Sequence, residues 1–372
     1  MNFEIKTKKY YNIEFIRFIF AVSIVYFHLL HSAMMPYVGK CSIYDALADQ
    51  TKYTKYIVEC FFIISGYFLY HTIQKNPQKT TLEFVMSRIC RLWPVLACSV
   101  ILSVFVNGKS LYASLVDLFF LQSSGLATDW KGLNWYVSAF FVVELFYFVL
   151  YKCFHNSAKM KLLICLLVYF GYELNINFMD GGFGRKMVYG MINLGLARAV
   201  AGIGLGYMLA DTWKSVVEKY KKHQTAGNQE NHGLPVVISI LEISTFVMLT
   251  LDFFCSDRAY DNQFIVVLLF PIFFVCLLTR KGVCSVFTDH KWSGFLGRYT
   301  YSVYVMQEIS FGILERTFWK NTGYLERYPV WSIMISIVVT FGIGILTYHL
   351  VEQPVGKLLK DRFAFLSDLS KT

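Results

Sequence analysis

The chain has 372 residues, of which 56% are hydrophobic and 18% aromatic, and its mean hydropathy is +0.46. This composition excludes an ordinary soluble domain and is typical of a polytopic helical membrane protein. The net charge of +10 would suit a nucleic-acid-binding protein, but the Lys and Arg residues lie in short clusters between apolar runs, as the positive-inside rule expects. We therefore predict no nucleic-acid partner. The nine cysteines have no metal-ligand spacing, so we also predict no metal.

Ten apolar segments are long enough, or nearly so, to cross a bilayer as helices. The predicted fold is therefore an all-α integral membrane bundle of about ten transmembrane helices. The third and fifth segments are short, and residues 111–124 are apolar enough for an interfacial or re-entrant piece, so nine or eleven spans are also compatible with the sequence. The ten segments are 14–32, 56–74, 92–107, 134–151, 161–175, 189–210, 235–254, 262–279, 295–314 and 330–351.

The distribution of basic residues predicts the orientation of these spans. With the N-terminus inside the cell, Lys and Arg are about twice as frequent in the cytoplasmic segments as in the outer loops, so we expect both termini in the cytoplasm. Residues 1–360 are expected to form one membrane domain, followed by a short cytoplasmic tail at 361–372. The basic stretch after Pro354 would lie along the anionic membrane lipids of the inner leaflet.

The first span contains Arg17 and His28, which are eleven residues apart. Eleven residues make about three helical turns, so the two side chains share one stripe and are separated by about 16 Å along the helix axis. That distance is about half the thickness of the hydrocarbon core. Because a charged residue at this depth is costly, Arg17 is a functional candidate by default.

The second span contains Glu59, Ser65 and Gly66. An acid at the mouth of a span needs a partner or water, so Glu59 is a candidate functional residue. Ser65 and Gly66 are small enough to let helices approach closely, and for Gly66 packing alone is the preferred explanation.

The third segment begins with Arg88 and Arg91, three residues apart, on the predicted cytoplasmic side. One helical turn would present both guanidinium groups to the same ligand, in a geometry suited to phosphate. The alternative is an ordinary positively charged flank, with Trp93 as an anchor at the membrane interface.

Later spans contain further charged positions. Arg198 lies in the middle of the sixth segment, where it would line a ligand tunnel or pair with an acid such as Glu144 or Glu242. Arg298 opens the ninth segment and Glu352 ends the last one, both on the predicted cytoplasmic side. Glu352 would form a structural ion pair with an arginine or contact the substrate, and the sequence leaves both roles open.

Five short motifs follow one another in a fixed order along the chain. They are Arg17 and His28 with ten residues between them, Glu59-x-Phe-Phe-x-x-Ser-Gly, Arg88-x-x-Arg-x-x-Pro, Tyr301-Ser-x-Tyr and Glu352-x-Pro. In this order, and with about ten spans, the chain resembles the acyltransferase-3 family of integral membrane acyltransferases. Residues 133–144 also resemble a stretch of that family, and the resemblance covers nearly the whole chain.

The resemblance implies transfer of an acyl group to a hydroxyl of an extracytoplasmic polysaccharide, lipid-linked sugar or related envelope glycan. The usual donor is acetyl-CoA, with succinyl-CoA as an alternative, and the implied location is the bacterial plasma membrane. The resemblance further implies that Arg17 and His28 are essential, that Arg88 and Arg91 bind the donor, and that Glu352 is a functional acid.

The chain departs from the family after the Tyr-Ser-x-Tyr motif, where a Trp-His pair often follows. Met306 and Gln307 stand there instead. Glutamine can donate and accept hydrogen bonds, but it cannot titrate near neutral pH. A role of the family histidine is therefore not expected here.

The predicted topology sorts the polar residues into a cytoplasmic cationic group and an outer group. We expect the CoA phosphates to bind the arginines, Arg298 included, while the thioester reaches His28. His28 would be the general base on the acceptor hydroxyl, with Arg17 and Glu59 as further catalytic residues, and a covalent acyl-histidine is the alternative. The other predicted donor-binding residues are Ser65, Tyr301, Ser302 and Glu352, and the outer group also holds Trp135, Gln307 and Glu308.

Two other functions agree with parts of the sequence. An exporter of a glycan or lipid-linked precursor would also use buried charges, although it would favour an inverted repeat, which the sequence does not display. A membrane sensor or scaffold is disfavoured because the sequence has no receptor-like or kinase-like region. The sequence leaves the acceptor open, and it leaves the oligomeric state open, with a homo-oligomer among the alternatives.

Overall fold

The computed structural model describes residues 10–37, 41–124, 132–179, 183–189, 192–225, 233–254, 264–319 and 324–369. Within these ranges the chain is helical almost throughout. The exception is a minimal antiparallel pair formed by β1 (Met187–Val188) and β2 (Ile192–Asn193). The prediction of an all-α membrane protein is confirmed.

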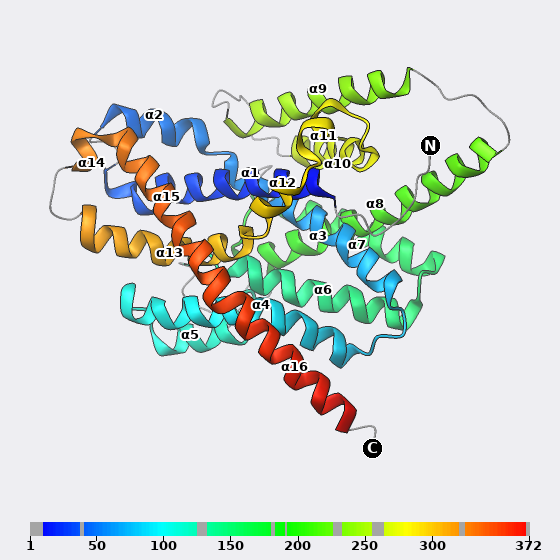
Figure 1. Cartoon of the computed structure of the whole chain (residues 1–372), viewed down its shortest axis with the longest axis horizontal. Helices are drawn as coiled ribbons and strands as arrows, with labels where there is room; N and C mark the ends of the chain where they lie inside the picture. The colour runs from blue at the N-terminus through cyan, green and yellow to red at the C-terminus, as the bar shows by residue number, and fades with distance from the viewer. Residues whose placement is uncertain are drawn as a thin grey trace.

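Figure 1 traces the helices in chain order, and most of the long ones run roughly side by side while α15 and α16 cross them diagonally. The α-helices are α1 (Tyr11–His28), α2 (Ser42–Thr51), α3 (Ile57–Lys75), α4 (Thr81–Val106), α5 (Leu111–Leu118), α6 (Trp135–Phe154), α7 (Ala158–Phe178), α8 (Leu194–Thr225), α9 (Leu234–Phe254), α10 (Phe264–Thr279), α11 (Val283–Thr288), α12 (Lys291–Gly297), α13 (Thr300–Leu314), α14 (Tyr324–Arg327), α15 (Pro329–Thr347) and α16 (Gln353–Leu369).

Five shorter helical turns of other types join these elements. Two are 3₁₀ turns, η2 (Met35–Tyr37) and η3 (Thr54–Tyr56), which lie on either side of α2. Three are π-helical, η1 (Leu29–Ala33), η4 (Glu315–Trp319) and η5 (Tyr348–Glu352), and each directly continues a long α-helix. π-turns occur frequently at functional sites. The turn η1 directly follows His28 and η5 ends at Glu352, so both turns favour a functional site near these residues.

Eight helices within the described residues are long and apolar enough to cross a membrane. They coincide with the first seven predicted segments and the tenth. The eighth is a shorter apolar helix, Ile265–Thr279, and the ninth is divided at Arg298 and Tyr299 into α12 and α13. α5 is short and exposes Leu111 and Leu115, which agrees with an interfacial piece. The predicted orientation stays a prediction.

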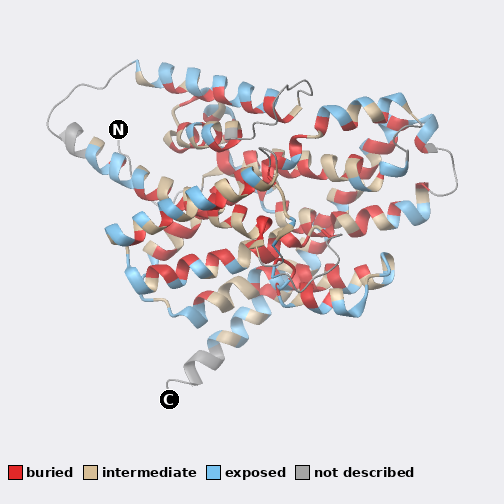
Figure 2. Cartoon of the chain, turned by 180° about the vertical axis from the view of Figure 1, so that it is seen from behind, coloured by how far each residue is buried: buried red, intermediate tan, exposed pale blue. Residues whose placement is uncertain are grey.

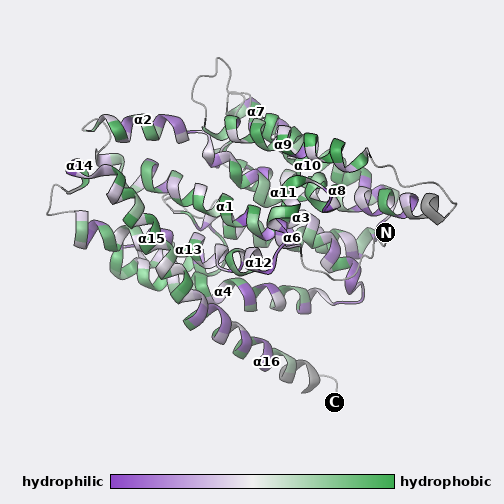
Figure 3. Ribbon diagram, turned by 45° about the horizontal axis from the view of Figure 1, so that its top comes forward, coloured by the Kyte–Doolittle hydropathy of each residue, from purple (hydrophilic) through white to green (hydrophobic). Residues whose placement is uncertain are grey.

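Several helices have their apolar side chains outside and their polar side chains inside. α9 exposes Ile240, Val247 and Leu251, whereas it buries Glu242 and Asp252. Figure 2 shows exposed faces along the outer helices, and in Figure 3 α9 and α10 are largely hydrophobic. This arrangement would be unfavourable in water, because it exposes apolar side chains. It is favourable in lipid, where the ionisable groups of a membrane bundle face its interior.

The backbones of α3 and α8 lie in close contact. A Cβ atom at Gly66 would clash with the carbonyl oxygen of Ile203, and a Cβ atom at Gly206 would clash with the carbonyl oxygen of Ile63. The two glycines therefore let the backbones of both helices touch, as small residues do in membrane bundles. This contact agrees with the packing explanation predicted for Gly66.

We expect Gly66→Ala to lower stability, because the added methyl group must push α3 away from α8. Overpacking of this kind costs about 1–3 kcal/mol. The measurement is the melting temperature of the purified protein in detergent. Gly342→Ala is the matched control, since a Cβ atom at Gly342 in α15 would meet no atom within 4 Å among the described residues. An equal melting temperature for the two variants would contradict the close contact.

Candidate active site

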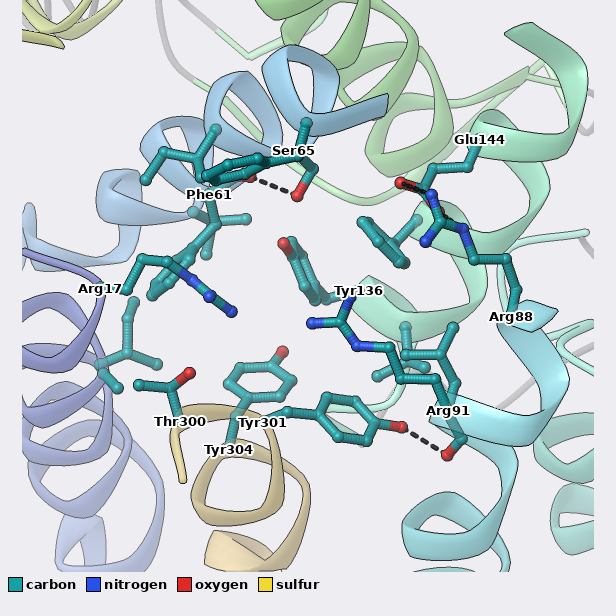
Figure 4. Close-up of a pocket in the computed structure, with 18 of the residues that line it drawn as sticks. Arg17, Phe61, Ser65, Arg88, Arg91, Tyr136, Glu144, Thr300, Tyr301 and Tyr304 are labelled. Carbon is teal, nitrogen blue, oxygen red and sulfur yellow. Dashed lines mark hydrogen bonds and ion pairs between the residues drawn. The ribbon is translucent and has the colours of Figure 1, made fainter. Parts of the chain in front are cut away.

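A cavity of about 340 Å³ opens between α1, α3, α4, α6 and α13. Figure 4 shows that charged and tyrosine side chains from these helices point into it. Its charged lining residues are Glu14, Arg17, Arg88, Arg91 and Glu144, and its tyrosines are Tyr136, Tyr301 and Tyr304. Three cationic groups, two carboxylates and several hydroxyls therefore face one space whose other lining residues are apolar.

α1 contributes one stripe of side chains to the cavity. Arg17, Ala21 and Ile24 line it, and they follow one another at spacings of four and three residues along the helix. His28 is the next position of this series, four residues after Ile24, but it lies beyond the lining residues. The predicted stripe is thus the one that faces the cavity, and His28 continues it by one turn.

α4 brings two arginines to the cavity. Thr80 and Glu83 form a capping box at its N-terminus, which fixes where the helix begins. Arg88 Nε lies 2.7 Å from Glu144 Oε2 on α6, so this arginine is held against the cavity wall. Arg91 is exposed to the cavity, and among the described residues no carboxylate lies at ion-pair distance from it. Both arginines thus line the cavity, but within the described residues Arg88 is ion-paired and Arg91 is not.

Arg17 and Arg91 face each other across the cavity in Figure 4. Arg17 Nη1 lies 3.0 Å from Glu14 Oε2, one turn earlier on α1. Glu352 is close enough for its charge to act on both arginines, although it is not among the lining residues. Two cations that point into one enclosed space favour an anionic ligand.

α13 forms another wall of the cavity and is tied to two neighbouring segments by tyrosine hydroxyls. Tyr301 Oη donates to Leu92 O in α4 at 2.6 Å, and Tyr304 Oη donates to Leu133 O at 2.8 Å. Sequence reasoning missed the lining roles of Tyr136 and Tyr304, although both lie in stretches that it singled out. Their hydroxyls offer hydrogen bonds to a ligand.

The segment before α6 is held in place by several hydrogen bonds. Arg185 Nη1 donates to Gly132 O at 2.9 Å, and Asn134 Nδ2 donates to Asp117 Oδ2 at 2.7 Å. Burial lowers the pKa of Arg185. These contacts fix the start of α6 and thereby the position of Tyr136.

His28 lies at the junction of α1 and the π-helical turn η1. Its Nδ1 is 3.2 Å from Gln307 Oε1 on α13, and its ring centroid is 6.5 Å from that of Tyr304. Tyr304 therefore lines the cavity and also neighbours His28. A long, thin ligand anchored at the arginines would approach His28 past this tyrosine.

A family model described as an acyltransferase domain matches residues 10–349. The chain belongs to the acyltransferase-3 family. Its curated relatives include the O-acetyltransferase OatA of Staphylococcus aureus strains NCTC 8325 / PS 47, COL and MRSA252, each 23% identical over 349 residues. These matches cover 83% of this chain but 54% of each relative, so the chain spans about half the length of those relatives. No solved structure matches it.

In this member of the acyltransferase-3 family, Glu59 is not among the residues that line the cavity. Its carboxylate is fully buried and forms an ion pair with Arg198 Nε on α8, and it accepts a hydrogen bond from Tyr172 Oη at 3.3 Å. The sequence left open whether Arg198 lines a ligand tunnel or pairs with an acid such as Glu144 or Glu242. The structure gives it a third partner, because Glu144 is held by Arg88 and Glu242 accepts from Cys284 N.

The remaining predicted site residues of this acyltransferase-3 chain divide into two groups. Ser65 and Tyr301 line the cavity, and Ser65 Oγ donates to Phe61 O at 2.7 Å. Ser302 lies behind the lining and donates to Glu352 Oε2 at 2.5 Å. Arg298 is exposed and stacks over Phe295, so the structure does not bring it to the cavity.

We expect Glu59→Gln to lower the melting temperature strongly, because it leaves Arg198 buried without its carboxylate. Breaking a buried ion pair in this way costs about 3–5 kcal/mol. Adding Arg198→Met should restore much of the stability, since the second change removes the unpaired charge. The measurement is thermal unfolding in detergent.

The control for this prediction is Asp49→Asn, which removes an exposed partner of Lys52 and should have little effect. A Glu59→Gln variant that melts like wild type but loses turnover would contradict the structural role and favour the predicted catalytic one.

Proposed function

We propose that this protein is a membrane O-acetyltransferase of the bacterial plasma membrane. It takes an acetyl group from cytoplasmic acetyl-CoA and transfers it to a hydroxyl of an extracytoplasmic glycan. Membership of the acyltransferase-3 family and the likeness to O-acetyltransferase OatA support the reaction class. The observation that carries the assignment is the stripe of α1, which lines the cavity from Arg17 and continues to His28.

The donor phosphates bind at the arginine side of the cavity. Arg91 carries a charge that no carboxylate at ion-pair distance neutralises among the described residues, and Arg17 faces it from α1. Guanidinium groups bind phosphate by paired hydrogen bonds, so two of them from different helices can hold the two ends of a diphosphate. Arg88 lines the same side but is already engaged by Glu144.

The acyl end of the donor reaches His28. The α-helical rise separates Arg17 and His28 by about 16 Å, a length that the extended pantetheine arm of CoA is suited to bridge. The path passes Tyr136 and Tyr304, whose rings contact each other with centroids 5.5 Å apart. These side chains keep bulk water away from the thioester.

The transfer itself needs one base and one leaving group. His28 Nε2 accepts the proton of the acceptor hydroxyl while the acceptor oxygen bonds to the thioester carbonyl carbon. The carbon–sulfur bond then breaks, and the CoA sulfur leaves with its electron pair and takes the proton from the imidazolium. The products are the acetyl ester and free CoA. Transfer through a covalent acyl-histidine is the second route.

We expect Arg91→Gln to raise the KM for acetyl-CoA by about 10–100-fold, because a hydrogen bond to a charged group contributes about 1.5–3 kcal/mol. The melting temperature should change little, since Arg91 has no ion-pair partner to lose within the described residues. Steady-state kinetics in membrane vesicles provide the measurement. Arg327→Gln, an exposed arginine stacked on Tyr328, is the control. An unchanged KM in Arg91→Gln would place the phosphates elsewhere.

We expect His28→Ala to lower acetyl transfer by about 10²–10⁴-fold, the usual contribution of a general base. The assay follows radiolabelled acetyl-CoA in vesicles that contain wild type or variant protein. His31→Ala is the matched control, because His31 lies on the following π-turn and contacts Thr51 of α2 instead. Full activity of His28→Ala would refute its role.

A wild-type protein that neither binds nor turns over acetyl-CoA or succinyl-CoA would refute the enzyme assignment itself. Export of a glycan or lipid-linked precursor would then be the better explanation.

A further inference from the structure

Gln307 is a fully buried residue of α13 whose side-chain oxygen faces His28. The distance between Gln307 Oε1 and His28 Nδ1 is 3.2 Å. Gln307 follows Tyr304 by three residues, slightly less than one helical turn, so the two residues lie on the same side of α13. Gln307 therefore contacts the candidate base and lies on the same helix as the lining residue Tyr304.

The chemistry of this contact decides which ring nitrogen of His28 carries the proton. An amide oxygen can only accept a hydrogen bond, so with Gln307 Oε1 facing His28 the contact favours the tautomer in which Nδ1 carries the hydrogen and donates it. In a neutral imidazole the other nitrogen, Nε2, then holds the lone pair. This is the tautomer that a general base needs when Nε2 faces the reacting hydroxyl, and a fixed partner at Nδ1 performs the same task in other histidine-based sites.

The other end of the amide argues against a merely structural role. Gln307 Nε2 is buried and has no hydrogen-bond acceptor in the part of the chain that the structure describes. Buried polar groups in helix bundles normally satisfy both ends of an amide, and an exception needs an explanation. The hydrogen bond to His28 is the contact that accounts for a glutamine here, since a packing role alone would be served better by an apolar residue.

We propose that Gln307 is a positioning residue for acyl transfer, which holds the His28 ring in the tautomer with a free Nε2. The inference rests on the proposed function of His28 as the general base. Gln307 acts through His28 and does not take a proton itself, in keeping with an amide that does not titrate near neutral pH.

The test compares Gln307→Leu and Gln307→Glu with wild type in the acetyl-CoA vesicle assay. Leucine removes the acceptor, so we expect kcat to fall about 10–100-fold, the usual loss when the partner that orients a histidine is removed. The KM for acetyl-CoA should stay unchanged, because the arginine side of the cavity is untouched. Glutamate keeps an acceptor oxygen for Nδ1, so we expect it to recover most of the lost kcat.

Ser310→Ala is the matched control for this test. Ser310 is also fully buried on α13, three residues after Gln307, and its hydroxyl donates to Met306 O within the same helix. This variant should keep both kcat and KM. Melting temperatures in detergent report whether each variant is folded, and Gln307→Met replaces Gln307→Leu if the leucine variant is not.

The outcomes separate this inference from the proposed function. A folded Gln307→Leu protein with wild-type kcat, or a Gln307→Glu protein as slow as the leucine variant, would overturn the role of Gln307 while the enzyme assignment stands. A wild-type protein without turnover would overturn the proposed function, and the inference would fall with it.

Discussion

Charged side chains inside an apolar helix bundle have to be neutralised, and this requirement determines how the helices of this protein assemble. Arg198 on α8 pairs with Glu59 on α3, and Arg88 on α4 pairs with Glu144 on α6. The two ion pairs join α3 to α8 and α4 to α6, and three of these four helices line the cavity. Removing a single member of either pair leaves a buried charge, so each pair constrains the position of both its helices.

The arginines that remain available define what the cavity can bind. Arg17 retains only a partner on its own helix, and Arg91 has none at ion-pair distance in the described part of the chain. The two lining carboxylates, Glu14 and Glu144, are each paired with an arginine, whereas Arg91 faces the cavity without such a partner in the described residues. An anion bound between these arginines would neutralise their charge. Because a ligand that binds only the folded protein stabilises it, such an anion would also stabilise the bundle.

Periodicity made part of this arrangement predictable from sequence. The helical phase of Arg17 and His28 needs only the spacing of residues on one helix, and the structure agrees with it. The partner of Arg198 could not be predicted, because several acids were available and the choice depends on how α3 and α8 pack. The division of segment 295–314 between α12 and α13 was also missed, since hydropathy does not detect a break inside an apolar run.

The regular geometry of α1 has a consequence for the choice of donor. An α-helix cannot shorten, so the charged end and the reactive end of the site are held about 16 Å apart. A small acyl phosphate, whose anionic group adjoins its acyl carbon, cannot contact Arg17 and His28 at the same time. Under the proposed function, the rigid helix α1 would therefore select a donor by its overall length.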